Sequence, residues 1–388
     1  MEHFIIKDTR SLKDFGTNTF SGYKKTDVIQ ELKKKIMNCD KQNAFLWAFE
    51  LLGCGEIQKI YDTLFFIIFK KIGIENPRLP HRFYRRYKFM IALREHYVSQ
   101  YSQNQKNKSM KWVDLELRNQ TSLRNHICEL ITICCESKKE TSPSCIKIKR
   151  NEFSGAFIKT KAKADTNDYI YGLRRRNDSN EVILAMNEIG YALKEKNETH
   201  AFFWISWILE WDFLLLKNGS KLLCGDRYHI YARDEANDVV WFIWEVLLKN
   251  SENLDKDVRL QIHSCFQLYK YDWTPGKKRS KSHLMLLCVE YIIKMYSMRH
   301  ETIGKLKHIL KESANSFFHI ETLKKHEIVE TNSSLWKLNS VKTRDKLIPS
   351  EKEKQMTSKQ REKKTREKLI KSSEEKIWTV YKLDKQMN

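Results

Sequence analysis

The segment from Phe20 to Arg82 constrains the fold most, because apolar periodicity and helix breakers alternate along it. Apolar residues recur there at a spacing of three and four, which places them on one side of a helix. The sequence has only 12 Gly and 5 Pro in 388 residues, too few for the many turns of an all-β fold. We therefore predict an all-α protein. The breakers of the segment are Gly53, Gly55, Gly73, Pro77 and Pro80.

The helices are predicted from apolar periodicity and from residues that start or stop helices. The first begins with Thr26 or Asp27 as its N-cap. The third, residues 56–71, is apolar almost all round, which is typical of a central helix in a bundle. Helices are predicted at residues 26–36, 42–52, 56–71, 81–99, 121–137, 180–196, 199–216, 236–249, 257–271, 282–296 and 301–318, and the pattern allows short strands at 3–6 and 145–149.

Composition shifts along the chain predict two helical-bundle domains and a basic tail. Residues 138–167 are polar, carry Pro143 and lack helical periodicity, so we interpret them as a linker. An N-terminal helical domain at 1–137 and a C-terminal helical domain at 168–330 then flank it. From residue 331 the apolar density falls, and residues 331–388 are predicted to be a charged, partly disordered tail.

The formal net charge of +22 is the strongest functional signal in the composition. Charge of this size attracts polyanions, so nucleic acid is the first partner to consider and an anionic membrane surface the second. A bias toward Lys, Asn and Ile explains the charge equally well. The most hydrophobic windows, 64–69 and 201–216, fall short of the ~20 uninterrupted apolar residues of a spanning helix, so we expect no membrane insertion.

The nine cysteines predict a reducing, intracellular compartment. Their number is odd, and they form no CxxC pair and no Cys/His ladder with zinc-finger spacing. Most lie in apolar runs, where a free thiol behaves as a small hydrophobic group. The N-terminal residues also lack the long apolar core of a signal peptide. No cofactor and no metal site is expected.

A run beginning at His81 interleaves basic and aromatic residues. On a helix, its arginines share roughly one side, while Phe83 and Tyr87 share another. Arginines pair with phosphates and aromatic rings stack on bases, so this helix is a candidate nucleic-acid contact. An amphipathic helix with buried aromatic rings and solvated arginines is the favoured alternative. The candidate contacts are Arg82, Arg85, Arg86 and Lys88.

Two further basic clusters lie in predicted loops at the start of helices, where exposed cations could contact a phosphate backbone. Solvated loop charge without a partner is an equally weighted alternative. The second cluster also resembles a nuclear-localisation pattern, which is a weak signal. The candidate residues are Arg174, Arg175 and Arg176 in the first cluster and Lys277, Lys278, Arg279 and Lys281 in the second.

No group of residues predicts catalysis. Glu210 and Asp212 are close in sequence, but two positions on a helix lie about 200° apart, so their carboxylates do not converge. Trp204, Trp207 and Trp211 recur beside them at helical spacing and are interpreted as a core stripe, with Glu210 paired to an arginine. The histidines form no HxxxH or HExxH pattern, so we predict a protein that is not an enzyme.

The run AFLWAFELLGCGEIQKIYDTLFFIIFKKIGIENPRLP, Ala44–Pro80, resembles the C-terminal collar of clamp-loader-type AAA ATPases, in the branch that includes the Werner-helicase-interacting ATPase. The shared features are a helix of small residues and Trp, a Gly-containing turn, a hydrophobic helix and Ile-Gly-Ile-x-Asn-Pro. The resemblance implies a structural bundle for subunit assembly, so self-association or a replication protein is expected at residues 26–72. The chain has no G-x-x-x-x-G-K-[ST] loop, and ATPase activity is not implied.

A broader resemblance links FSGYKKTDV, NPRLP, RNHICEL, SWILEWD and LYKYDWTPGKKR, in this order, to uncharacterised proteins of large nucleocytoplasmic DNA viruses. It implies a viral context, in the host nucleus or a cytoplasmic virus factory. Together these observations favour a non-catalytic nucleic-acid-binding or scaffolding protein of viral DNA replication or transcription complexes. The alternative is a virion or virus-factory structural protein with generic positive charge. An enzyme whose site is assembled from distant residues stays open.

Overall fold

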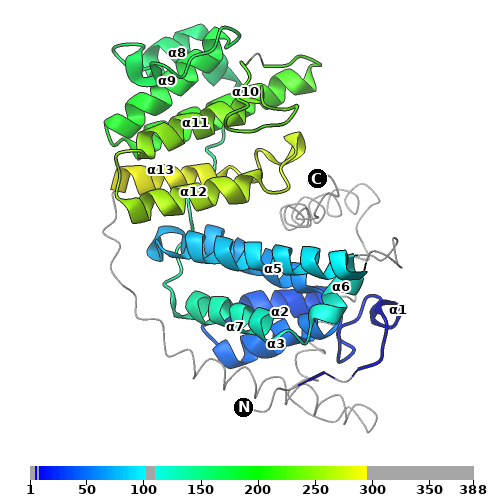
Figure 1. The fold of residues 1–388 in the computed structure, drawn as a ribbon. Helices are drawn as coiled ribbons and strands as arrows, with labels where there is room; N and C mark the ends of the chain where they lie inside the picture. Colours follow the sequence, from blue (N-terminus) through cyan, green and yellow to red (C-terminus); the bar gives the residue numbers. More distant parts are fainter. Residues whose placement is uncertain (1–4, 7, 102–109, 223, 295–388) are drawn as a thin grey trace, which may run out of the picture. The chain divides into compact units, whose positions relative to one another are not determined.

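The computed structural model describes residues 5–6, 8–101, 110–222 and 224–294 (Figure 1). These residues form thirteen α-helices and no strand, which confirms the all-α prediction. The helix predicted at 301–318 and the tail at 331–388 lie outside the described residues. The helices are α1 Leu12–Phe15, α2 Lys25–Met37, α3 Lys41–Gly53, α4 Ile57–Ile67, α5 Leu79–Tyr101, α6 Met110–Leu117, α7 Thr121–Glu136, α8 Gly155–Lys161, α9 Asn180–Lys194, α10 Glu198–Lys217, α11 Val239–Ser251, α12 Lys256–Lys270 and α13 His283–Lys294.

The described residues divide into two compact units, and each unit is built from two separate segments of the chain. The first unit comprises residues up to 62 together with the segment 97–131. The second comprises residues 63–96 together with 132–294. This division differs from the predicted domain boundary at residue 137, because residues 63–96 belong to the same unit as the second half of the chain.

In the first unit, α2 packs along α3 (Figure 1). The apolar face of α2 is buried as its periodicity predicts, but its N-cap is Lys24, so the prediction of Thr26 or Asp27 is wrong. The side chain of Asp40 caps α3 and accepts a hydrogen bond from the backbone N–H of Asn43. The chain then turns at Gly55, whose φ of +73° lies in the left-handed region that favours glycine.

In the second unit, α9 packs against α10 and α11, and α13 packs against α11 and α12 (Figure 1). The stripe predicted on α10 is confirmed for Trp204 and Trp207, which are buried, whereas Trp211 is only half-buried; Glu210 pairs with Arg279, as expected. The indoles of Trp241 and Trp244 from α11 are also fully buried. Large aromatic side chains therefore make up much of this core.

The segment before α5 joins the second unit through a few long-range bonds. The Asn76 side-chain amide donates to Ser137 Oγ at 2.8 Å, and the Tyr291 hydroxyl donates to the Pro77 carbonyl at 3.0 Å. Phe83 of α5 packs edge-on against Phe65, with ring centroids 5.6 Å apart. The two hydrogen bonds join residues 63–96 to the second half of the chain, whereas the Phe83–Phe65 contact packs the segment against itself.

The predicted linker at 138–167 is part of the second unit. Residues 145–149 form no strand, so that suggestion is wrong; the N–H of Ile146 bonds instead to the hydroxyl of Ser206 at 2.9 Å. The linker also contains α8, which was not predicted because a helix of 7 residues shows too little periodicity. Within the described ranges, no helix combines the length and the apolarity needed to cross a membrane.

Candidate nucleic-acid interface

The basic and aromatic run on α5 folds as the amphipathic alternative describes. Phe83 and Tyr87 are buried, and Tyr87 packs against Tyr271 with ring centroids 5.2 Å apart. These rings are therefore not available to stack on bases. Arg82 and Arg86 are half-buried, whereas Arg85 and Lys88 are exposed. The run offers two exposed cations on one helix without exposed aromatic rings beside them.

The cations of the cluster at 277–281 mostly form ion pairs or hydrogen bonds within the protein. The prediction that they are exposed is wrong for Lys278 and Lys281. Lys278 is buried, and its Nζ lies 2.5 Å from Asp212 and 2.6 Å from Asp238. Burial disfavours the charged ammonium, but the two carboxylates outweigh this effect and raise the pKa of Lys278. Lys278 therefore joins α10 to the start of α11 rather than meeting solvent.

Lys281 is also buried, with its side chain at the C-terminal end of α12. Its Nζ donates to the carbonyls of Leu268, Tyr269 and Tyr271 at 3.3, 3.1 and 2.5 Å. The last turn of a helix leaves carbonyl groups without intrahelical partners, and this ammonium satisfies three of them. Burial lowers the pKa of Lys281 to about 7.

The other two cations of this cluster are paired as well. Lys277 Nζ lies 2.9 Å from a carboxylate oxygen of Asp272. Arg279 is partly exposed, pairs with Glu210 and places its guanidinium 4.6 Å from the ring centroid of Phe213. Asp272 is near Lys277 in sequence, but sequence proximity could not reveal Glu210 and Asp212 as partners of this cluster, because both lie on α10, far away in the chain.

The cluster at 174–176 keeps its cations at the surface. Arg174 and Arg176 are exposed, and Arg174 donates a hydrogen bond to the carbonyl of Asn167. Arg175 is half-buried, and its guanidinium lies 3.2 Å from Glu245 of α11. The three arginines therefore have two roles: the outer two face solvent, and the middle one anchors the loop.

A fully buried arginine holds this loop against the loop at 224–229. The guanidinium of Arg227 lies 3.0 Å from Asp178 and 2.8 Å from Glu245, and it stacks 3.5 Å from the ring centroid of Phe242. It also donates to the carbonyl of Leu173 at 3.2 Å. A planar guanidinium with five donors can bridge several acceptors in this way.

Asp178 completes the junction between the two loops. Its carboxylate accepts hydrogen bonds from the N–H groups of Arg175 at 2.7 Å and Gly225 at 2.8 Å. Burial opposes the carboxylate, but Arg227 and these N–H groups outweigh it and lower the pKa of Asp178. The carboxylate therefore stays charged, and both loops are fixed in position around a charged, hydrogen-bonded centre.

We call the outer surface of these loops the loop platform, defined by Tyr171, Arg174, Arg176, Tyr228 and His229. Tyr171 is 85% exposed and Tyr228 57% exposed, both unusually open for aromatic side chains. His229 is partly exposed, with Nε2 2.8 Å from Glu245. The sequence analysis did not identify either tyrosine as a candidate contact. The pattern that could have indicated them is a tyrosine within three residues of an arginine, in a segment without helical periodicity.

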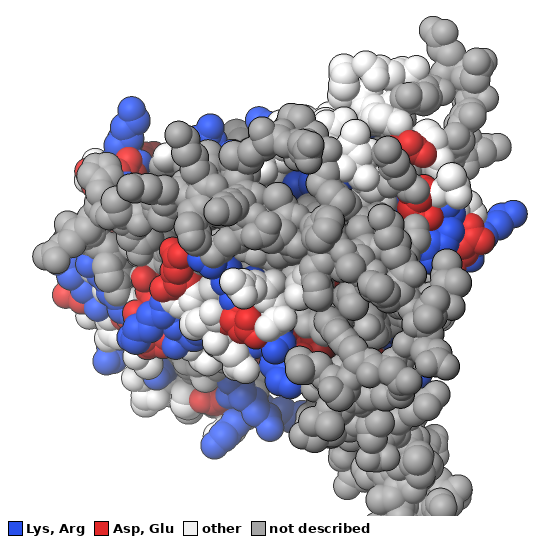
Figure 2. Space-filling model, turned by 90° about the horizontal axis from the view of Figure 1, so that it is seen from below, with Lys and Arg blue, Asp and Glu red and all other residues white. Residues whose placement is uncertain are grey.

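The face of the molecule drawn in Figure 2 is mixed in charge. On the face drawn in Figure 2, Lys and Arg side chains are distributed over the described residues with Asp and Glu among them. Positive side chains do not gather there into one continuous area. The feature that marks the loop platform is therefore the combination of exposed arginines with exposed tyrosines, not charge alone.

Most other reactive side chains in the described residues are buried, except Cys39 and Cys145, which are exposed. Glu188 and His200 form a buried pair with 2.6 Å between Oε2 and Nε2, and Glu188 also accepts from the N–H of Ala164 at 2.9 Å. All nine cysteines are free, and burial raises the pKa of Cys54 to about 12. Across the described parts of the chain, no group of three His, Cys, Asp or Glu residues could hold a metal ion.

The collar-like segment also presents little apolar surface. Trp47 is 6% exposed and packs edge-on against Tyr23, and nearly all the apolar side chains of α3 are buried. An assembly contact through this segment would therefore have to use its polar positions.

Comparison of the chain with protein-family models, with curated proteins and with solved structures finds no match.

Proposed function

We propose that this protein is a non-catalytic nucleic-acid-binding protein that contacts single-stranded nucleic acid through the loop platform. The observation that carries the proposal is the combination of exposed Tyr171 and Tyr228 with exposed Arg174 and Arg176 on two fastened loops. Unpaired bases stack on aromatic rings, and arginines pair with the phosphates between them. A paired duplex would hide its base faces from the tyrosines, so we expect a single strand.

Rigidity of the platform supports this role. Arg227 and Asp178 fix the loop backbones before any ligand arrives, so less conformational entropy is lost on binding. The net charge of +22 adds long-range attraction for any polyanion. Action within a viral replication or transcription complex remains part of the proposal and is supported by the sequence resemblances alone.

The test is fluorescence anisotropy of labelled single-stranded DNA, single-stranded RNA and duplex DNA across a salt series. We expect tighter binding of single strands, and a loss of at least tenfold in the double variant Arg174→Gln/Arg176→Gln. Tyr171→Ala should also weaken binding, by about 1–3 kcal/mol if one base stacks on that ring. Equal affinity of wild type and the double variant would contradict the proposal.

A matched control removes the same charge elsewhere on the second unit. Lys147 and Lys149 are exposed and lie outside the platform. The variant Lys147→Gln/Lys149→Gln has the same net charge as the platform variant, so a purely nonspecific attraction would weaken equally in both. We expect the control to retain most of the affinity.

The mixed surface in Figure 2 favours a second candidate function, a virion or virus-factory structural protein with generic positive charge. For that role, both double variants would lose the same small fraction of affinity, and single strands would gain nothing over duplex. The same titrations therefore decide between the two functions.

A further inference from the structure

Residues 145–163 form a surface segment of the second unit that is separate from the loop platform, and we call it the basic strap. It includes the short helix α8 (Figure 1). Basic residues outnumber acidic ones in it by six to one, whereas the whole chain has 71 Lys and Arg against 49 Asp and Glu. The acidic residue is Glu152, and the basic residues are Lys147, Lys149, Arg150, Lys159, Lys161 and Lys163.

The cations of the strap differ from the cluster at 277–281 because they lack carboxylate partners. Five of the six are exposed, and Lys161 is half-buried with its Nζ 4.5 Å from the ring centroid of Phe203. Among the described residues, none of the six side chains has a carboxylate within ion-pairing distance. Glu152 accepts a hydrogen bond from the backbone N–H of Lys149 instead of pairing with an ammonium group. The positive charge of the strap is therefore not neutralised by the rest of the described structure.

The backbone of the strap is fastened to α10 and α9 at its two ends. At the first end, the N–H of Ile146 donates to Ser206 Oγ at 2.9 Å. At the other end, the N–H of Lys163 donates to the buried carboxylate of Glu188 at 3.0 Å. Because these bonds hold the backbone, less conformational entropy is lost when a partner binds than at an unattached loop.

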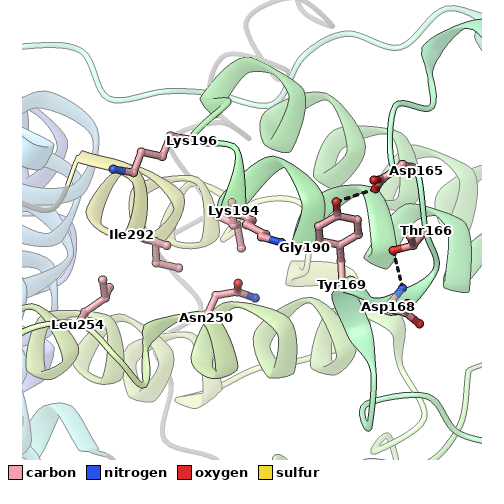
Figure 3. Close-up of a pocket in the computed structure, with 11 residues that line it drawn as sticks. Asp165, Thr166, Asp168, Tyr169, Gly190, Lys194, Lys196, Asn250, Leu254 and Ile292 are labelled. Carbon is pink, nitrogen blue, oxygen red and sulfur yellow. Dashed lines mark hydrogen bonds between the residues drawn. The ribbon is translucent and has the colours of Figure 1, made fainter.

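Beyond the strap, the surface becomes mixed in charge. Asp165 and Asp168 line a cavity of about 600 Å³ together with Lys194 and Lys196 (Figure 3). Asp165 also accepts a hydrogen bond from Tyr169 at 2.7 Å, as the dashed line in Figure 3 shows. The carboxylates there offset the lysines, so the cavity favours neither an anion nor a cation. In this part of the second unit, the uncompensated positive charge therefore ends with the basic strap.

Apolar side chains lie among the cations of the strap. Phe153 packs against Trp207 with ring centroids 5.4 Å apart, and Phe157 packs against Phe203 at 6.1 Å. Phe203 and Trp207 are about one helical turn apart, so these rings hold the strap along one side of α10. The apolar side chains that keep contact with solvent are Ile146, which is 39% exposed, and the half-buried Ile148, Phe153, Phe157 and Ile158. The strap therefore combines unpaired cations with partly open apolar groups.

We infer that the basic strap binds an acidic segment of a partner protein in which carboxylates and aliphatic side chains are interspersed. The carboxylates of such a segment neutralise the exposed cations, and its aliphatic side chains cover the partly open apolar groups between them. A phosphate backbone would use the cations alone. A bilayer would need apolar side chains that project beyond the cations, whereas most of those in the strap are half-buried. The inference goes beyond the proposed interface and stands without it.

The test is fluorescence anisotropy of three labelled synthetic peptides with the full-length chain. The acidic aliphatic peptide repeats Glu-Asp-Leu, the acidic polar peptide has Ser in place of each Leu, and the neutral peptide has Gln and Asn in place of Glu and Asp. We expect saturable binding of the acidic aliphatic peptide, with an affinity that falls as the salt concentration rises. The other two peptides should bind at least tenfold more weakly.

Variants of the strap locate the binding. Lys147→Gln/Lys149→Gln removes two exposed cations and should weaken binding of the acidic aliphatic peptide at least tenfold. Ile146→Ser should weaken binding of that peptide while leaving binding of the acidic polar peptide unchanged. The charge-matched control Lys88→Gln/Lys256→Gln changes exposed lysines of α5 and α12 and should bind as wild type does. Melting temperatures equal to that of wild type check that the variants fold.

A second strap variant, Lys159→Gln/Lys163→Gln, should show the same loss at the other end of the segment. The inference is overturned if the acidic aliphatic peptide does not saturate the protein, or if either lysine variant of the strap binds it with wild-type affinity. Equal binding of the acidic polar peptide would also overturn it, because charge alone would then explain the affinity. Duplex DNA and vesicles of phosphatidylserine and phosphatidylcholine are titrated in parallel. If either of these binds more tightly than the peptide and loses affinity in both strap variants, the strap belongs to that partner and the inference fails.

Discussion

Lys281 shows how a single buried cation makes the stability of this chain depend on pH. Its pKa is lowered to about 7 in the folded state and is near 10.5 in the unfolded chain. Between these values the unfolded state holds one more proton, so the free energy of unfolding rises with pH. The slope contributed by one group is at most about 1.4 kcal/mol per pH unit.

We therefore predict that the variant Lys281→Met loses this contribution. Urea unfolding at pH 6.5, 7.5 and 8.5 should show wild type gaining stability relative to the variant as the pH rises. The series stops at pH 8.5 because buried thiols such as Cys54 oppose the trend above pH 9. Parallel pH dependence in the two proteins would show that Lys281 remains charged in the folded state.

Lys278 lies three residues earlier and has the opposite pKa shift, because two carboxylates surround it. The variant Lys278→Met should leave Asp212 and Asp238 buried without a cation, and breaking a buried pair costs about 3–5 kcal/mol. Arg279→Met, which breaks a partly exposed pair, should cost about 1 kcal/mol or less. Comparable losses in the two variants, measured by urea unfolding, would contradict this assignment.

At the scale of elements, Arg227 is the residue that joins two loops to α11. The variant Arg227→Met should lower the free energy of unfolding by about 3–5 kcal/mol, because Asp178 and Glu245 lose their shared cation. Amide hydrogen exchange in residues 171–178 should accelerate, since the loop loses its anchor. Arg233→Met, an exposed arginine of the same loop region, is the control and should change neither quantity by much.

Helix positions were largely predictable because they depend on local periodicity and capping. The helix predicted at 180–196 is α9, and Ser179 caps it by accepting a hydrogen bond from the N–H of Val182. The short helices α6 and α8 were missed because 8 and 7 residues contain too few repeats. The N-cap predicted for α2 was wrong. Thr26 and Asp27 are residue types that favour the N-cap position, but the helix already begins at Lys25, so both residues lie inside its first turn.

The candidate site was less predictable, for a physical reason. Whether a lysine meets solvent depends on distant carboxylates, and Lys278 pairs with residues 66 and 40 positions away. The exposed tyrosines of the platform had no periodicity to mark them. Arg174 and Arg176 were predicted, and the structure leaves them exposed, but the sequence contained no indication that Arg227 and Asp178 fasten their loop.

For the whole molecule, the division of the chain determines which fragments can fold. Residues 138–294 alone would lack residues 63–96, whose Phe83 is buried and whose Pro77 carbonyl accepts from Tyr291. They would also lack the contact between His81 Nδ1 and Ser264 Oγ, which is 2.9 Å long. The exposed apolar surface left behind would destabilise the fragment by about 25 cal/mol per Å².

We therefore predict that the fragment 138–294 unfolds at a lower urea concentration than the fragment 63–294, which retains every described segment of the second unit. The fragment 138–294 should also show a weaker near-ultraviolet circular dichroism signal from its buried tryptophans, because their packing loosens. If both fragments unfold cooperatively at the same midpoint, then residues 63–96 contribute nothing to this unit, and the boundary near residue 137 that composition predicts is the true one.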